Sequence, residues 1–530
     1  MAISKIYNPN YHRLINKRIK LLYKYFLENL STELNNIHSE NFKIYEWEIL
    51  IGHWLKIFTK KILGHYYSKN QNIRNNLKFE NINITNQSYD FNSICSEIFW
   101  NQQFNFFINQ IKKKKKLKIK KINNFAFETK EKNFISGLKE STKKVYFYLF
   151  KSIFKKYKII IYNSYLGKYR DILLQLKYGY IPLINLPKNF KYNTASKKLR
   201  DSILKNKHSK KNFYKFYQLL IYNMPTNFLE NYKNMKNFVS KNYPSKTKLI
   251  FNSSESITDD TFKMWVLLQK KKNKTKLLIL EHGLNYGIVN DNYPQIPRIE
   301  LKYADYIFTW GKSNIPRSIP MFTSSDKFFK IEKKEKLVLI LNQSIPDIHY
   351  INNKECFDNY FSIKRFYNNL DNKLKKKLMI RLHKTNFKPY SKKKILKKIK
   401  LETKNSKLSI NDGFEKMNKL VKLSRILVFT YPSTGFLEAI RSNVPCLMLW
   451  KNFDLEIDIS AKKNFETLRR DEIIFTSEKK LSKKVNKIWN KIDLWWYEKN
   501  IQKNLRKFKN KYCNGKINLN KIYREINKIA

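Results

Sequence analysis

Two hydroxyl side chains, Ser433 and Thr434, stand between an apolar run and a helical pattern in LVFTYPSTGFLEAIRSNVPCLMLW, residues 427–450. LVFT predicts a strand that a proline ends, GFLEAIRSN predicts a helix, and residues 444–450 predict a second strand. Such a βαβ unit holds ligands beyond the carboxyl end of its first strand, where Tyr431 and the two hydroxyls stand. Because the first amides of a helix lack partners and its dipole favours an anion, a phosphate or a sugar diphosphate fits this turn.

The alternative is that Ser433 or Thr434 only caps the helix. A capping box places Glu or Gln three residues after the capping hydroxyl, whereas Glu438 stands four residues after Thr434 and five after Ser433. This spacing puts Glu438 about one turn into the helix. Its carboxylate is then able to accept hydrogen bonds from the hydroxyls of a ribose. We therefore favour a ligand-binding role for the turn.

Acid–base chemistry is best placed at His282, in the segment EHGLNYG that follows a predicted strand at 277–280. Gly283 permits close approach of the backbone, and histidine titrates near neutrality. Asn285 and Tyr286 are polar neighbours that we expect on the acceptor side of the cleft. A hydrogen-bonded turn histidine is the alternative. A strand-terminal His followed by Gly is expected to face a cleft, which favours a general base or a group that stabilises the transition state.

Two further strand ends supply polar candidates. Arg381 ends the apolar run KLMIR, and a guanidinium at such an edge is suited to neutralise a diphosphate. A solvated surface charge is the alternative. Ser164 and Tyr165 follow the apolar run KIIIYN, and we expect them at the cleft, on the acceptor side.

The elements that must position these residues form an α/β pattern. Residues 1–155 are mainly helical in period, and residues 156–325 and 326–478 each alternate strands with helices. Within the first half, the run at 181–184 predicts a strand. Residues 479–530 carry an apolar helical stripe and are expected to pack across both halves. Two α/β halves with polar strand ends facing each other predict a two-lobed enzyme with a cleft.

The composition is strongly basic, with a formal net charge of +65 over 530 residues. The excess of Lys beside Asn, Ile, Tyr and Phe is typical of an AT-rich genome, yet such a surface still attracts anionic lipids, nucleotides and polyanions. The densest run, KKKKKLKIKK at 112–121, is the best candidate for a membrane contact, with an exposed loop as the alternative. No stretch reaches the ~20 apolar residues of a spanning helix, and the first residues lack a signal-peptide pattern. These features predict a cytoplasmic protein with peripheral contact at the anionic inner membrane.

Several chemistries lack their motifs. No GxGxxG follows a first strand and no GxxxxGK[ST] occurs, which argues against dinucleotide oxidoreductases and P-loop NTPases. There is no HExxH or paired-acid constellation, and the four cysteines show no CxxC spacing. We therefore expect no metal site and no cofactor. The absence of a nucleic-acid-binding module argues against a specific nucleic-acid partner.

Several motifs in one order resemble a family of transferases encoded within bacterial lipopolysaccharide and surface-polysaccharide clusters. The resemblance covers most of the chain from about Tyr45 onward, and the motifs that carry it are EWEILIGHWL, TDDTFKMW, HGLNYG, YADYIFTWG, YPSTGFLEAIRSNVPCLMLW and NKIWNKIDLWW. It implies a GT-B-like fold, in which two Rossmann-like domains face a cleft. More remotely, the chain is similar to GT-B transferases that build teichoic-acid and capsular polymers. In those, a His-Gly motif supplies a catalytic His and a Ser/Thr-rich turn holds donor phosphate, roles that would fall on His282, Ser433 and Thr434. Glu281 departs from the pattern, because relatives tend to have Gln there.

Together these features predict a metal-independent glycosyltransferase. It would use a nucleotide-activated sugar as co-substrate and a glycan or lipid-linked acceptor of surface-polysaccharide or lipopolysaccharide assembly. Ser433 and Thr434 would hold the donor phosphates, Glu438 the ribose, with Arg381 and Tyr431 nearby. A polyol-phosphate transferase of the same fold is one alternative. A non-enzymatic polyanion or nucleic-acid binding protein, suggested only by charge, is another, and it would bind with a steep dependence on salt.

Overall fold

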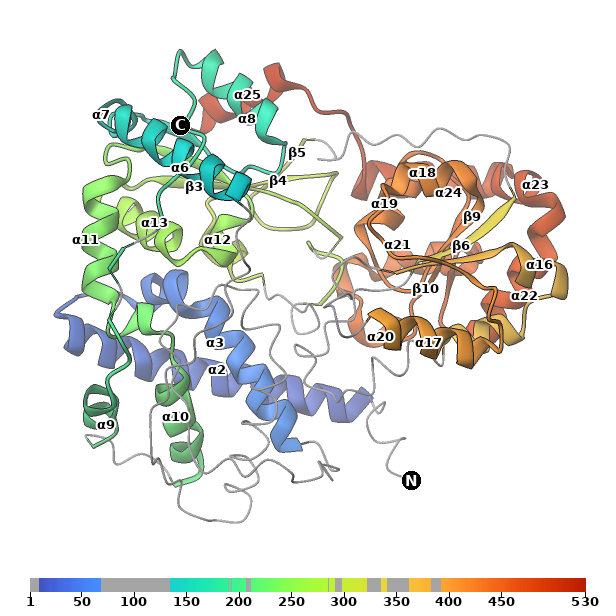
Figure 1. Ribbon diagram of the computed structural model, residues 1–530, viewed down its shortest axis with the longest axis horizontal. Coiled ribbons are helices and arrows are strands. Elements are labelled where there is room, and N and C mark those ends of the chain that lie inside the picture. Colours follow the sequence, from blue (N-terminus) through green and yellow to red (C-terminus); the bar gives the residue numbers. More distant parts are fainter. Residues whose placement is uncertain are drawn as a thin grey trace.

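Two parallel sheets organise the chain (Figure 1). The computed structural model describes residues 9–67, 134–188, 190–191, 193–205, 211–284, 286–290, 298–321, 335–340, 362–382 and 392–530. The first sheet has the strand order β1-β2-β3-β4-β5 and the second the order β11-β10-β9-β6-β7-β8. Neighbouring strands are parallel in both sheets. The predicted α/β architecture of two Rossmann-like domains is therefore confirmed.

Four of the five strands of the first sheet are short apolar runs that are buried on both faces, as expected for a parallel sheet covered by helices, whereas the edge strand at 318–320 is partly exposed. Its strands are β1 (Ile159–Ile161), β2 (Leu249–Asn252), β3 (Lys276–Leu280), β4 (Tyr306–Thr309) and β5 (Ser318–Pro320). The helices around it are α8 (Lys168–Lys177), α9 (Lys197–Lys205), α10 (Lys211–Asn223), η1 (Thr226–Phe228), α11 (Tyr232–Asn242), α12 (Glu255–Thr258), α13 (Asp260–Asn273) and α14 (Glu300–Tyr303).

The strand expected at 181–184 is absent, and that prediction was wrong. Pro182 has no amide hydrogen to give to a ladder. The amide of Leu183 instead donates to the side chain of Gln175 at 2.6 Å. The apolar side chains of this segment serve as irregular cover for the domain core.

The second sheet contains the βαβ unit predicted from residues 427–450. Leu427, Val428 and Phe429 of β9 are in parallel register with Cys446, Leu447 and Met448 of β10. The strands are β6 (Lys336–Ile340), β7 (Leu378–Arg381), β8 (Ser409–Asn411), β9 (Ser424–Phe429), β10 (Cys446–Leu449) and β11 (Ile474–Phe475). The helices are α16 (Asn372–Lys377), α17 (Lys392–Thr403), α18 (Met417–Leu423), α19 (Thr434–Arg441), α20 (Phe453–Glu456) and α21 (Ile459–Arg470).

The N-terminal helices belong to the core of the first domain. They are α2 (Pro9–His38), α3 (Ile44–Tyr67), α6 (Phe134–Leu149) and α7 (Lys151–Phe154), and α2 and α3 lie side by side (Figure 1). Trp47 of α3 is fully buried and contacts the ring of Tyr232 in α11, with 5.6 Å between ring centroids. The apolar stripe of α3 therefore completes the same core as one face of the first sheet.

The C-terminal helices pack across both domains, as predicted. They are α22 (Glu478–Ile488), η3 (Trp489–Lys491), α23 (Ile492–Trp496), α24 (Lys499–Tyr512) and α25 (Leu519–Ile529). Helix α24 packs on α19 and α21 of the second domain, whereas α25 returns to lie beside α8 of the first (Figure 1). Ile522, Ile526 and Ile529 of α25 are buried in one core with β1, β2 and β3.

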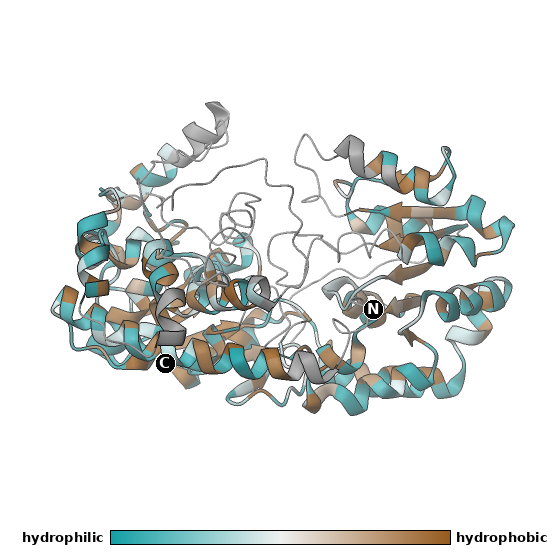
Figure 2. Cartoon of the chain, turned by 90° about the horizontal axis from the view of Figure 1, so that it is seen from below, coloured by the Kyte–Doolittle hydropathy of each residue, from teal (hydrophilic) through white to brown (hydrophobic). Residues whose placement is uncertain are grey.

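Hydrophobic residues concentrate in the strands, and the outer helices are striped with polar and apolar residues (Figure 2). Within the described ranges, no helix combines the length and the apolar character that crossing a membrane would require. The Lys-rich run at 112–121 lies outside the described residues.

The end of α24 docks on the first domain through backbone contact at Gly311. A Cβ atom at Gly311 would lie 2.3 Å from the carbonyl oxygen of Lys511 and 2.9 Å from that of Asn510. Close by, the amide of Asn514 donates to the carbonyl of Trp310 at 2.8 Å. Only a residue without a side chain allows this approach.

We expect Gly311→Ala to destabilise the protein by ~1–3 kcal/mol, because the backbone of α24 must move to admit the methyl group. The change is read as a lower midpoint of chemical or thermal unfolding. Lys511→Ala is the matched control, since it leaves the backbone carbonyl in place and should shift the midpoint little. Equal effects of the two substitutions would contradict the backbone contact.

Candidate active site

The two sheets meet along one seam, formed by the segment after β3 and the segments after β9 and β10. A Cβ atom at Gly283 would lie 3.1 Å from Oγ1 of Thr434, the first residue of α19. A few residues on, Val289 and Ile457 form an antiparallel bridge between the domains. Since these segments all follow the carboxyl ends of strands, the seam is where a parallel sheet places ligands.

His282 lies at this seam beside a residue from another loop of the first domain. The ring of Tyr165 is 5.1 Å from that of His282, centroid to centroid. Burial raises the pKa of Tyr165, and the Glu438 carboxylate of the second domain raises that pKa further. The structure therefore gathers His282, Gly283, Tyr165, Thr434 and Glu438, all predicted site residues, in one place.

The hydrogen bonds at Nδ1 of His282 determine its tautomer. Ser253 Oγ is 2.7 Å from Nδ1 and donates its own hydrogen to the carbonyl of Leu280 at 2.8 Å. The hydroxyl of Tyr286 is 3.0 Å from Nδ1 and donates its hydrogen to Glu300 Oε1 at 3.2 Å. Because both neighbours of Nδ1 use their hydrogens elsewhere, Nδ1 must carry the proton. The lone pair of the neutral imidazole is then on Nε2.

Burial and the nearby Arg298 guanidinium lower the pKa of His282 to about 4, while Glu300 acts in the opposite direction. Arg298 Nη1 lies 3.4 Å from Nε2 of His282. The imidazole is therefore neutral at neutral pH. Among the described residues, its Nε2 accepts only this long hydrogen bond from Arg298, and a neutral imidazole is able to accept a proton from a hydroxyl group.

Glu281, next to His282 in the chain, forms two hydrogen bonds with Trp310. Its side chain accepts a hydrogen bond from the Trp310 amide, and its carbonyl accepts one from the indole nitrogen, both at 2.8 Å. Burial raises the pKa of Glu281 to about 8. At neutral pH this side chain is thus mostly uncharged.

On the donor side, Ser433 is the N-cap of α19. Its Oγ accepts a hydrogen bond from the amide of Phe436 at 3.2 Å, and its side chain is buried. Ser433 therefore caps helix α19, as the alternative interpretation of the sequence expected. Thr434 begins the helix and directs its hydroxyl to the seam, against Gly283.

Arg381, at the carboxyl end of β7, has an incompletely paired guanidinium. Its Nη2 donates to the carbonyl of Gly413 at 3.3 Å. Its Nη1 is buried and has no hydrogen-bond partner among the described residues. Burial lowers the pKa of Arg381, whereas Glu415, Tyr431 and Asp412 raise it. Burial also raises the pKa of Tyr431, against a hydrogen bond with Ser433.

Ser164, which was also predicted for the cleft, has other surroundings. Ser164 is fully buried, and its hydroxyl and amide both donate to the carboxylate of Asp171, which stabilises the turn between β1 and α8. Tyr165 has a left-handed backbone (φ 73°) that leaves its side chain half-exposed. Asn285 lies outside the described residues.

The family of this protein follows from a comparison along the chain. A model described as the LIC12162 family transferase matches residues 10–526. The chain belongs to the LIC12162 family of transferases. Its two Rossmann-like domains, which meet at their carboxyl edges, are the GT-B-like arrangement that the sequence resemblance implied. No curated protein matches the chain.

Solved structures similar to this LIC12162 family transferase include three with low identity. MurG of Acinetobacter baumannii is 10% identical over 70% of this chain and 99% of its own, with a TM-score of 0.36. A variant of the wall teichoic acid polymerase TagF is 12% identical over 74% and 97%, with a TM-score of 0.34. MnaA of S. aureus, solved with UDP, is 11% identical over 65% and 90%, with a TM-score of 0.35.

Four residues at the site of this LIC12162 transferase were missed by sequence reasoning. Ser253, Arg298 and Glu300 surround His282 or Tyr286, and His53 of α3 contacts Glu300. None stands in a recognisable motif. For His53 a signal existed, because a histidine within the apolar stretch ILIGHWLKIF needs a buried polar partner.

Within the part of the chain that the structure describes, no three His, Cys, Asp or Glu side chains are grouped so that they could hold a metal ion.

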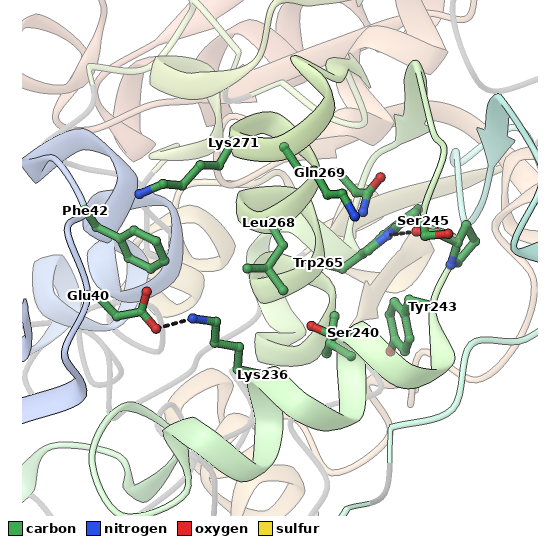
Figure 3. A pocket seen from close by; sticks show the side chains of 13 residues that line it. Glu40, Phe42, Lys236, Ser240, Tyr243, Ser245, Trp265, Leu268, Gln269 and Lys271 are labelled. Atoms are coloured by element: carbon green, nitrogen blue, oxygen red, sulfur yellow. Dashed lines mark hydrogen bonds and ion pairs between the residues drawn. The ribbon is translucent and has the colours of Figure 1, made fainter.

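A pocket of about 300 Å³ lies away from these residues, between α11, α13 and the connection of α2 to α3 (Figure 3). Trp265, Tyr243 and Phe42 line it together with several lysines. Lys236 pairs with Glu40, and Lys271 Nζ donates to the carbonyl of residue 41 at 2.8 Å. None of the predicted site residues lines this pocket.

We expect Glu281→Gln to stabilise the protein increasingly as pH rises from 5 to 8.5, relative to wild type. The carboxyl has an ordinary pKa of 4.5 when unfolded and about 8 when folded. The native state therefore binds more protons across this range, and its stability falls as pH rises through the folded pKa. Gln keeps the neutral form throughout.

The measurement is the melting temperature of both proteins across that range. Glu466→Gln is the control, because Glu466 pairs with Arg469 at the helix surface at 2.9 Å. A pH-independent difference between Glu281→Gln and wild type would contradict the raised pKa.

Proposed function

We propose that this transferase is a metal-independent glycosyltransferase. It moves a sugar from a nucleotide-activated donor to a hydroxyl group of a glycan or lipid-linked acceptor, in surface-polysaccharide or lipopolysaccharide assembly. One observation carries the proposal: the hydrogen bonds at Nδ1 of His282 leave Nε2 without a proton, at the seam where Thr434 of the second domain approaches Gly283. Transfer to a hydroxyl group needs such a base.

In the proposed reaction, the acceptor oxygen attacks the anomeric carbon of the donor sugar. His282 Nε2 takes the hydroxyl proton as the new C–O bond forms. The bond from the anomeric carbon to the diphosphate oxygen breaks, and the nucleoside diphosphate leaves with the electron pair. The Glu300 carboxylate, which raises the pKa of His282, favours the imidazolium that results.

The second domain would hold the donor. The free Nη1 of Arg381 and the first amides of α19 would neutralise the diphosphate. Ser433 would act by holding the helix start, Thr434 through its hydroxyl and Glu438 by accepting hydrogen bonds from the ribose. The unpaired donor of Arg381 supports this assignment, because a buried cationic donor is costly without an acceptor.

The surface of the protein bears on where it acts. We propose that it works at the cytoplasmic face of the inner membrane, where its net charge of +65 attracts anionic headgroups. Such attraction would keep the enzyme close to lipid-linked acceptors.

We expect one of UDP, CMP, GDP and CDP to raise the melting temperature of wild type and to raise that of Arg381→Gln much less. A ligand at 100 times its Kd stabilises the folded state by about 2.7 kcal/mol. Arg425→Gln is the matched control, because Arg425 lies on β9 of the same sheet, near the amino end of the strand. Its shift should equal that of wild type.

Other outcomes of this screen decide between functions. Stabilisation by oligonucleotides or anionic vesicles, but by no nucleotide, would overturn the glycosyltransferase proposal in favour of charge-driven binding.

We expect His282→Asn to lower the rate of sugar transfer ~10²–10⁴-fold, the usual contribution of a general base, and to leave nucleotide binding unchanged. Asn keeps an amide donor near the position of Nδ1 and removes Nε2. In wild type, kcat/KM should fall only as pH drops towards about 4, where His282 becomes protonated. Transfer should be insensitive to EDTA. An acid limb near 6.5 that persists in His282→Asn would show that another group is the base.

A further inference from the structure

We propose that Glu300 and His53 are positioning residues for the base. They hold the hydroxyl of Tyr286, and through it the tautomer and orientation of His282, so that the N-terminal helix α3 takes part in the active site. The catalytic meaning of this inference rests on the proposed function, whereas the contacts themselves do not.

The Glu300 carboxylate is the centre of the arrangement. Its Oε2 is 2.8 Å from Nε2 of His53, and its Oε1 accepts the hydroxyl hydrogen of Tyr286 at 3.2 Å. Arg298 Nη1 is 3.6 Å from Oε1. Glu300, His53 and Tyr286 are each at most 2% exposed. A continuous chain of contacts thus runs from α3 to Nδ1 of His282.

The direction of each hydrogen bond follows from the charge on Glu300. A buried carboxylate alone would become neutral, but the hydrogen bond from His53 and the charge of Arg298 lower the pKa of Glu300 despite burial. An ionised carboxylate only accepts hydrogen bonds. His53 Nε2 and the hydroxyl of Tyr286 must therefore both donate to it. The oxygen of Tyr286 is left to accept from Nδ1 of His282, whose hydrogen it shares with Ser253 Oγ.

His53 is neutral in this arrangement. Burial lowers its pKa, and the charges of Lys263 and Arg298 lower that pKa further, against the hydrogen bond to Glu300. Its Nδ1 is buried without a hydrogen-bond partner among the described residues. The His53 ring therefore donates one hydrogen bond, from Nε2 to Oε2 of Glu300.

Packing alone does not account for this cluster. Replacing a buried ion pair by apolar groups of similar volume is often neutral or stabilising, so the fold itself does not require these charges. Perturbed titratable groups concentrate at functional sites. The groups facing His282 come from four places: Tyr165 from the turn after β1, Ser253 from the turn after β2, Tyr286 from its own loop, and Arg298 with Glu300 at α14.

The first test measures the pKa of His282 in the full-length protein without substrate, by NMR of histidine-labelled samples. The resonance is identified by its loss in His282→Asn. Removing the negative charge in Glu300→Gln should lower the pKa of His282 below its wild-type value, because that charge favours the imidazolium. His53→Leu should shift it in the same direction, whereas His53→Gln, which keeps a donor towards Oε2, should not.

The second test measures transfer with the nucleotide sugar that the screen above identifies. We expect kcat to fall about 10- to 100-fold in His53→Leu, the usual effect of losing a group that orients an active-site ligand, with KM nearly unchanged. His53→Gln should recover most of the rate. Tyr286→Phe breaks the chain at a second point and should resemble His53→Leu, even if Glu300→Gln fails to fold.

The outcomes separate the two proposals. An unchanged pKa of His282 in Glu300→Gln and His53→Leu, or equal kcat in the two His53 variants, would overturn the positioning role. The expected pKa pattern in a protein that transfers no sugar would support the positioning role and count against the proposed glycosyltransferase.

Discussion

The close approach of the loop after β3 to the start of α19 is the constraint on which the site depends. Gly283 carries no side chain, and Thr434 occupies the space that a Cβ atom would approach. The backbone bridge between Val289 and Ile457 continues the contact. Because of this approach, side chains from the carboxyl edges of two separate sheets share one small volume. Residues far apart in the chain become available to a single reaction.

The charged groups around His282 have opposing effects on one another's pKa values. Burial and the charge of Arg298 keep His282 neutral, and Glu300 acts against them. His53 and Arg298 in turn keep Glu300 ionised despite its burial. Glu281 avoids a second negative charge by remaining protonated at neutral pH. The surroundings of each group determine its protonation state, so the site is prepared for proton transfer before any ligand binds.

Much of the fold could be predicted because it is local. The apolar runs of β2, β3 and β9, and the polar residues that follow them, are visible in the sequence, and parallel pairing places them on one edge. The run at 181–184 was wrongly predicted to be a strand, because its apolar residues pack on the core without pairing with a neighbouring strand. The short strands β5 and β8 carry too few residues for a period to show.

The site was predictable where it follows a strand and hidden where it depends on tertiary contacts. His282, Thr434 and Glu438 stand at strand ends or one turn beyond. Ser164 follows a strand too, but the carboxylate of Asp171 draws it inward. The apolar surroundings of His53 indicate that it has a buried polar partner, but Glu300 lies 247 residues away, and no local pattern identifies it as that partner.

The return of α25 to the first domain bears on how the chain acquires its structure during synthesis. Ile522, Ile526 and Ile529 complete a core that begins at β1, yet the whole second domain lies between them in the chain. Domains generally fold as units, the N-terminal one first, as they leave the ribosome. Here the earlier domain keeps an apolar face uncovered until the later one has been made. The first domain to be synthesised is therefore the last to be finished, and the nascent chain must protect that face in the meantime.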